Sequence, residues 1–139
     1  MNYRLSCAAD RVSGREGFVL ECNGKELDSE IFRCVSENLK ECILESIYRG
    51  IRVTRNYVNH DDIVFIEVQN VHVYEWLSGM KEYRAYSEYL DKIFEVLESM
   101  DCRYKFIFRR DLYAKKYINV KELSKMKVSS LESVMEEFE

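Results

Sequence analysis

The stretch SENLKECILESIYRG, residues 36–50, decides how the rest of the sequence is interpreted. It predicts the first helix of the chain, because apolar residues recur in it every four positions and so share one helical face. Ser36 suits the start of a helix, and Gly50 suits a left-handed stop at its end. The apolar residues on the shared face are Leu39, Ile43 and Ile47. We therefore expect a helix over 36–50 with one face in the core.

The residues before this helix predict three antiparallel strands, over 3–9, 17–22 and 25–34. The dipeptide Asn23-Gly24 separates the second strand from the third. It is a strong hairpin signal, because both central residues of a type I′ turn need a positive φ, which Asn and Gly tolerate best. The first third of the chain is therefore expected to form a meander.

The residues after the helix predict two further strands and three further helices. Residues 63–68, IVFIEV, are nearly all apolar, which is typical of a strand covered on both faces. A strand, a crossover helix and a second strand imply that the first and fourth strands pair in parallel. Residues 103–109, RYKFIFR, alternate in polarity and predict the fifth strand. Helices are expected over 71–77, 87–100 and from about 120 onward, whereas 51–62 is open between helix and loop.

Composition sets the class of protein. The 139 residues are 47% hydrophobic and 33% charged, which predicts one globular domain over 1–139. No run approaches a membrane span, and the N-terminus lacks the pattern of a signal peptide, so we expect a cytoplasmic protein. The five cysteines are odd in number and have no ligand spacing. We therefore expect reduced thiols and no metal site.

Positive charge is concentrated in one part of an otherwise acidic chain. The formal net charge is −4, yet the basic segment 103–127 holds nine Lys/Arg against two Asp/Glu. Lysines and arginines with tyrosines between them can bind phosphates and stack bases. The alternative is that basic side chains here only protect an edge strand from aggregation. The candidate nucleic-acid-binding residues are Arg109, Arg110, Tyr113, Lys115, Lys116 and Tyr117.

The order of these elements resembles the ribonuclease H-like superfamily. The stretches that carry the resemblance are YRLSCAAD (3–10), GFVLECNGKELDS (17–29), VSENLKE (35–41), IVFIEVQN (63–70) and VKEL (120–123). The resemblance covers nearly the whole chain in topology and is closest over 3–74. It implies an α/β fold with a mixed five-stranded sheet, three antiparallel strands and then parallel strands, flanked by helices.

The resemblance also implies a test for nuclease activity. Active members hold two divalent metals with carboxylates from the first strand, first helix, fourth strand and last helix. The matching positions here are Ala8, Glu41, Gln69 and Lys121, so one carboxylate is retained. One carboxylate cannot neutralise two Mg²⁺ ions. The alternative is a shifted cluster that binds Mg²⁺ or Mn²⁺ through Asp10, Glu41, Glu67 and Glu122.

The leading hypothesis is therefore a non-catalytic module that acts by binding a protein, as an adaptor, an inhibitor or a self-associating domain. Tyr and Arg are common interface anchors, and one short span is rich in them. Its residues are Trp76, Tyr83, Arg84, Tyr86 and Tyr89. The first alternative is binding of RNA or an RNA–DNA hybrid through the basic segment. The second is a divergent metal-dependent nuclease, the only case in which a cofactor is expected.

Overall fold

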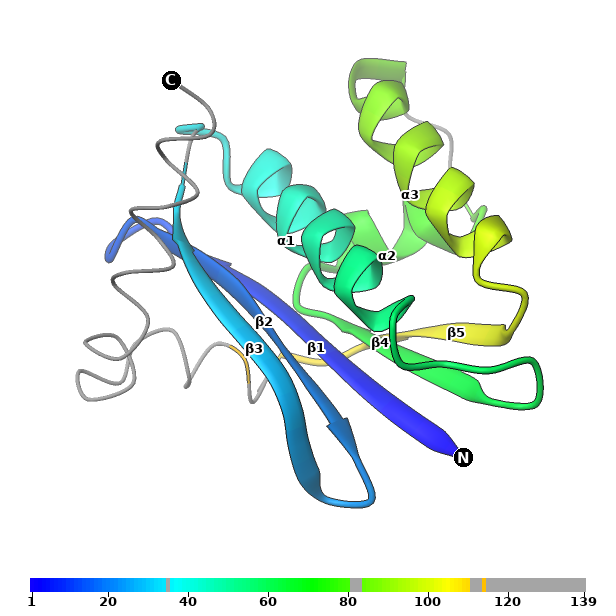
Figure 1. Cartoon of the computed structure of the whole chain (residues 1–139). Helices are drawn as coiled ribbons and strands as arrows, with labels where there is room; N and C mark the ends of the chain where they lie inside the picture. The colour runs from blue at the N-terminus through cyan, green and yellow to red at the C-terminus, as the bar shows by residue number, and fades with distance from the viewer. Residues whose placement is uncertain (35, 81–83, 111–113, 115–139) are drawn as a thin grey trace.

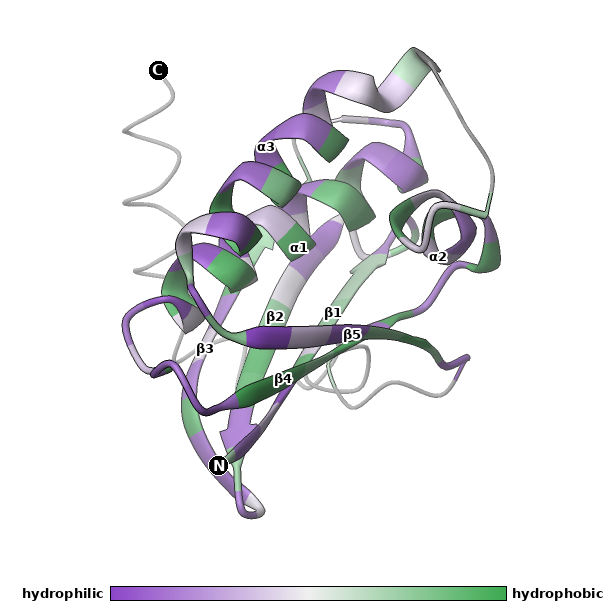
Figure 2. Ribbon diagram, turned by 90° about the vertical axis from the view of Figure 1, so that its right-hand side faces the viewer, coloured by the Kyte–Doolittle hydropathy of each residue, from purple (hydrophilic) through white to green (hydrophobic). Residues whose placement is uncertain are grey.

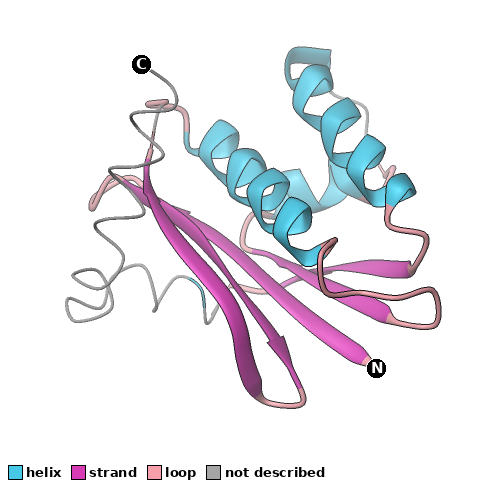
Figure 3. Cartoon of the chain, in the orientation of Figure 1, coloured by secondary structure: helices cyan, strands magenta, loops and turns pink. Residues whose placement is uncertain are grey.

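The computed structural model describes residues 1–34, 36–80, 84–110 and 114. A five-stranded sheet carries α1 and α3 on one face, with α2 near one end of the strands (Figure 1; Figure 3). The elements in chain order are β1 (Asn2–Asp10), β2 (Arg15–Cys22), β3 (Lys25–Arg33), α1 (Leu39–Thr54), β4 (Ile63–Val68), α2 (Val71–Leu77), a 3-10 turn (Arg84–Tyr86), α3 (Ser87–Ser99) and β5 (Arg103–Phe108). None of the helices in these described ranges is long and apolar enough to cross a membrane.

The sheet has the predicted mixed topology. The strand order is β3-β2-β1-β4-β5. The pairs β1–β2 and β2–β3 are antiparallel, whereas β1–β4 and β4–β5 are parallel. At the tip of the β2–β3 hairpin, φ is 54° at Asn23 and 75° at Gly24, as the predicted type I′ turn requires. The fold-class prediction is confirmed.

The main core lies between the sheet and the helices. Alternate residues of β1 and β4 point into it, including Leu5, Val64 and Ile66, and all three are fully buried. Figure 2 shows apolar residues along much of β4, the strand predicted to be covered on both faces. A smaller cluster on the opposite face consists of Ala8, Val19, Ile31 and Ala114. The backbone N–H of Ala114 donates to Ser6 Oγ at 3.1 Å, which places this residue against β1.

Helix α1 differs from the prediction at both ends. Its N-cap is Asn38, whose Oδ1 accepts from the backbone N–H groups of Lys40 and Glu41, so the predicted start at Ser36 was wrong. The predicted stop at Gly50 was also wrong, because the helix continues to Thr54. A Cβ at Gly50 would lie 3.0 Å from Leu5 Cδ1. The glycine is therefore explained by close packing of α1 on the sheet and not by a helix stop.

The later elements follow the predictions closely. The fourth strand and the short helix have the predicted bounds, and α3 ends one residue early. The open stretch 51–62 divides into the last turn of α1 and a loop. The helix expected from about residue 120 lies outside the described residues.

Candidate functional site

The carboxyl ends of β1 and β4 meet at one edge of the sheet, where a glutamine joins them. Gln69 Oε1 accepts from the backbone N–H of Ala9 at 2.9 Å, and Gln69 Nε2 donates to the carbonyl oxygen of Ala9 at 2.9 Å. Both polar groups of the side chain are used. A carboxylate at this position could accept the first bond but could not donate the second. The Gln69 side chain therefore links the end of β4 to the end of β1.

Glu67 lies one strand repeat before this glutamine and is paired with arginines. Its side chain is 3% exposed, and it lies 3.0 Å from Arg109 Nε and 3.9 Å from Arg4 Nε. Val64, Ile66 and Val68 point toward the helices, so the alternation of β4 places Glu67 on the opposite face of the sheet. The carboxylate charge is balanced by guanidinium groups there.

The other acids of the predicted shifted cluster have separate partners. Ser36 Oγ donates to Glu41 Oε2 at 2.5 Å in the first turn of α1. Asp10 Oδ1 accepts from the backbone N–H of Val12 at 2.9 Å, in the turn after β1. Within the described ranges, no three acidic, Cys or His side chains are placed to hold a metal ion. The structure therefore does not bring Asp10, Glu41 and Glu67 together, and Glu122 lies outside the described residues.

Two arginines lie at the same edge of the sheet. The backbone N–H of Arg109 donates to the carbonyl oxygen of Val68 at 3.0 Å, so β5 ends beside β4. The Arg109 side chain is 54% exposed, and Arg110 is exposed as well. We call Ala9, Glu67, Gln69, Arg109 and Arg110 the strand-end site. It combines guanidinium and amide donors at the carboxyl ends of β1, β4 and β5.

Phosphate contacts require exposed basic side chains, and the described part of the basic segment has them at two of the candidate positions. Arg109 and Arg110 both reach solvent. The four other candidate residues, Tyr113, Lys115, Lys116 and Tyr117, lie outside the described residues. Of the six candidate nucleic-acid-binding residues, the structure therefore places Arg109 and Arg110.

The aromatic set predicted to bind a protein is largely internal where the structure describes it. Trp76 is 7% exposed and Tyr86 is 8% exposed, and their rings stack with centroids 5.2 Å apart. Asn38 Nδ2 donates to Tyr86 Oη at 2.7 Å, which ties the start of α1 to this ring pair. The prediction that these two residues form an exposed surface was wrong, because they fill the core. Tyr89 is half-buried, whereas Tyr83 and the side chain of Arg84 lie outside the described residues.

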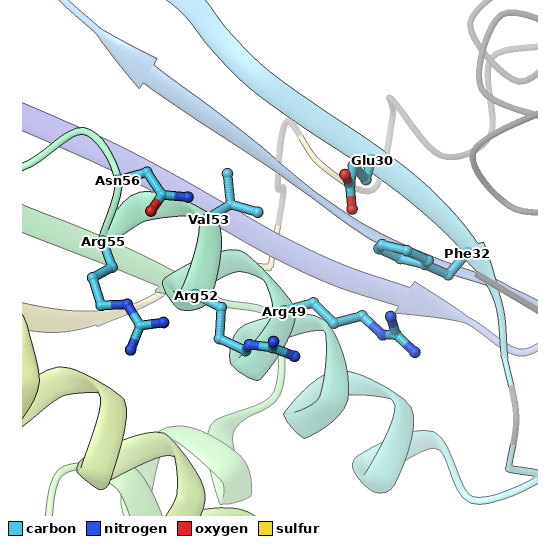
Figure 4. Close-up of a pocket in the computed structure, with 7 residues that line it drawn as sticks. All are labelled: Glu30, Phe32, Arg49, Arg52, Val53, Arg55 and Asn56. Atoms are coloured by element: carbon cyan, nitrogen blue, oxygen red, sulfur yellow. The ribbon is translucent and has the colours of Figure 1, made fainter. Parts of the chain in front are cut away.

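A second basic feature was missed from the sequence. Arg49 and Arg52 of α1, together with Arg55 at its C-cap, line a groove beside β3 (Figure 4). Their spacing of three residues was a usable signal. The predicted end of the helix at Gly50 separated Arg49 from the other two, so the row was not recognised.

A buried acid was missed as well. Glu16 is 0% exposed, and neither of its carboxylate oxygens has a hydrogen-bond partner within the described part of the chain. Burial is the main cause that raises the pKa of Glu16 to about 10; nearby Glu45 and Cys42 contribute to the rise, and Arg49 opposes it. The group is therefore neutral in the folded protein at pH 7. The predicted strand 17–22 leaves this residue out, whereas β2 begins at Arg15.

Two thiols lie next to this acid. Cys42 Sγ is 3.2 Å from the carbonyl oxygen of Ser36, at the start of α1. A hydrogen bond from Cys34 lowers the pKa of Cys42 to about 7, with Ser36 contributing and burial opposing. All five cysteines are free, in agreement with the expected reduced thiols.

Comparison with known proteins identifies the fold. No family model matches the chain, and no curated protein matches it. Among solved structures, the N-terminal RNase H domain of rv2228c from Mycobacterium tuberculosis is 10% identical, with a TM-score of 0.64 over 93% of this chain and 97% of that chain. LC11-RNase H1 in complex with an RNA/DNA hybrid is 13% identical, with a TM-score of 0.59 over 88% and 91%. RNase H1 from the halophilic archaeon Halobacterium salinarum is 11% identical, with a TM-score of 0.59 over 78% and 85%. The chain therefore has a ribonuclease H-like fold.

Proposed function

We propose that this ribonuclease H-like chain is a non-catalytic module that binds an RNA–DNA hybrid through its strand-end site. The observation that carries the proposal is the Gln69 side chain, which bonds to both backbone groups of Ala9 between the ends of β1 and β4. This is where the fold's nucleases hold metal with carboxylates. Here the position is neutral, and its polar groups are already bonded.

We expect no cleavage of the hybrid, because the negative charge that would hold two metal ions is not gathered in one place. A two-metal mechanism needs several carboxylates around ions about 4 Å apart, so that four positive charges are balanced and both reacting oxygens are held. Glu67, the nearest acid on β4, faces away from α1 and is paired with Arg109 at 3.0 Å. Glu41 is bonded to Ser36 on the helix side of the sheet. These acids are separated by the sheet and cannot share a metal pair in this arrangement.

We expect binding of the hybrid to depend on the guanidinium N–H donors of the strand-end site. Arg109 and Arg110 are exposed next to the strand ends, and a guanidinium presents a planar set of N–H donors that fits phosphate oxygens. The ion pair with Glu67 holds Arg109 in place while leaving its side chain 54% exposed. LC11-RNase H1, which has the same fold, is seen with an RNA/DNA hybrid. Proteins recognise such duplexes mainly by backbone shape and 2′-hydroxyl contacts, which require no metal.

The test is fluorescence anisotropy of a labelled RNA–DNA hybrid in EDTA, repeated with a DNA duplex of the same sequence. The hybrid is expected to bind more tightly than the DNA, with an affinity that falls as salt rises. Arg110→Gln is the informative variant, because it leaves the Arg109–Glu67 pair intact. It should weaken binding and reduce the slope of log affinity against log salt by about one. Arg103→Gln removes an equal charge at the start of β5 and serves as the control.

Two results would overturn the proposal. One is the absence of salt-dependent hybrid binding by the folded protein. The other is an equal loss of affinity in Arg110→Gln and Arg103→Gln, which would show that overall charge, and not the strand-end site, is responsible.

A further inference from the structure

We propose that the groove between α1 and β3 is a second, separate site, which binds the phosphate of a nucleotide-sized ligand. We call it the arginine groove. It has a volume of about 370 Å³, within the range of small-molecule sites. Its lining residues are Glu30, Phe32, Arg49, Arg52, Val53, Arg55 and Asn56. Figure 4 shows the arginines projecting from α1, with Glu30 and Phe32 on the neighbouring strand.

Arg49 and Arg52 are oriented by aromatic rings. The Arg49 guanidinium carbon lies 4.3 Å from the centroid of Phe32, and its Nη2 lies 2.8 Å from Glu45 Oε1. The Arg52 guanidinium carbon lies 5.3 Å from the centroid of Tyr48. The edge of Arg49 is bonded to Glu45 through Nε and Nη2, whereas stacking on Tyr48 uses the face of the Arg52 guanidinium and leaves its N–H edge toward an anion. The groove is therefore partly pre-organised for a planar, bidentate contact.

Arg52 and Arg55 carry the uncompensated charge of the groove. Among the described residues, neither has a carboxylate oxygen within 4.0 Å. Arg55 contacts only a neutral group by its side chain there, since its Nη1 donates to Ser99 Oγ at 3.5 Å. Two positive charges three residues apart on a helix repel each other. A bound dianion removes this repulsion.

The helix dipole does not account for this arrangement. A cation in the last turn of a helix is favoured by a charge of about −0.5 at the terminal carbonyls. That term favours one basic residue, such as Arg52, in the last turn. The dipole explains neither the presence of three arginines at a spacing of three residues nor the groove beside them. Two guanidiniums without a carboxylate partner among the described residues also outweigh half a negative charge, so the local potential that these residues create attracts an anion.

The opposite wall of the groove narrows the class of ligand. Glu30 lies on β3 and repels a second anionic group, but its carboxylate can accept hydrogen bonds from sugar hydroxyls. Asn56 adds a neutral amide on the α1 side. A ligand with its charge at one end and hydroxyls at the other fits both walls, which is the chemistry of a nucleoside phosphate. A free nucleotide and the phosphorylated 5′ end of an oligonucleotide share this chemistry.

The test is titration of the ¹⁵N-labelled protein with adenosine 5′-diphosphate, pyrophosphate and adenosine, followed by amide chemical shifts. ADP and pyrophosphate should shift the amides around Arg52 and Asn56, whereas adenosine should not. Arg52→Gln and Arg55→Gln should each weaken ADP binding by about tenfold, as expected for loss of one charge-assisted hydrogen bond. Arg103→Gln, which removes a charge outside the groove, should bind as the wild type does.

Oligonucleotides with and without a 5′ phosphate distinguish the two possible ligands, a free nucleotide and a nucleic-acid end. Binding of a 5′-phosphorylated oligonucleotide through the groove, with no binding of its 5′-hydroxyl form, identifies a nucleic-acid end. Binding of ADP without either oligonucleotide identifies a free nucleotide. The inference is overturned if 5 mM ADP and pyrophosphate leave the groove amides unshifted, or if all three arginine variants lose ADP binding equally. Because the strand-end site is assayed with Arg110→Gln, failure here leaves the proposed function standing, and the reverse also holds.

Discussion

Substitution of Glu16 by Gln should change how the stability of the protein depends on pH. Glu16 lies in β2 with an exposed fraction of 0%, and no residue that the structure describes forms a hydrogen bond with its two carboxylate oxygens. Burial raises its pKa from 4.5 to about 10. The folded state therefore keeps this proton throughout the neutral range, whereas the unfolded chain releases it near pH 4.5. Gln has nearly the same shape and no proton to release.

The sign and size of the effect follow from proton linkage. Between pH 4.5 and 10 the folded state binds one more proton than the unfolded state, so the Glu16 contribution is largest below pH 4.5 and declines as pH rises. One proton corresponds to about 1.36 kcal/mol for each pH unit. From pH 6 to pH 8, the free energy of unfolding of the wild type should fall by about 3 kcal/mol relative to Glu16→Gln. An unpaired amide costs about 1–3 kcal/mol, but that cost does not vary with pH.

The assay is urea unfolding of both proteins at pH 6, 7 and 8, with the difference in free energy plotted against pH. Glu88→Gln, which removes an exposed acid on α3, reports the effect of losing one surface charge. The free energy of unfolding of Glu16→Gln minus that of the wild type should rise by about 1.36 kcal/mol for each pH unit. A flat difference would show that Glu16 is ionised in the folded protein and would refute the reasoning from burial.

Three further substitutions test the packing and the strand-end geometry by urea unfolding. Gly50→Ala should destabilise the protein by about 1–2 kcal/mol, because overpacking against Leu5 outweighs the gain in helix propensity; an increase in stability would contradict the close approach. Asn38→Ala should cost about 1 kcal/mol through loss of the N-cap, and an unchanged midpoint would show that α1 starts elsewhere. Gln69→Glu should cost about 1–3 kcal/mol at pH 7, because a carboxylate cannot donate to the Ala9 carbonyl; wild-type stability would argue against the two-bond link.

The strands were predictable because their signals are local. A type I′ turn at Asn23-Gly24 sets the register of a hairpin, and a nearly all-apolar run at 63–68 marks a central strand. The ends of α1 were not predictable in the same way. Ser36 and Asn38 are both good N-caps, and only the fold decides between them. Gly50 matches a helix stop in sequence, but its reason is the side chain of Leu5 on another element.

The candidate sites depended on contacts that sequence patterns do not contain. Trp76 and Tyr86 have the composition of an interface, yet they stack on each other in the core. The arginine groove exists only once α1 continues past Gly50 and packs beside β3. The resemblance matched Gln69 to a carboxylate position, but the link from its side chain to the backbone of Ala9 is visible only in the structure.

The central claim, binding without cleavage, is tested most directly by one experiment on a labelled RNA–DNA hybrid. The hybrid is incubated with the protein in Mn²⁺ and examined for cleavage, while binding is measured in EDTA on samples from the same preparation. The account predicts a bound hybrid that stays intact in Mn²⁺. Cleavage that disappears in Glu41→Ala would contradict it and would show that a metal site assembles despite Gln69. A hybrid that is neither bound nor cleaved would contradict the nucleic-acid role itself.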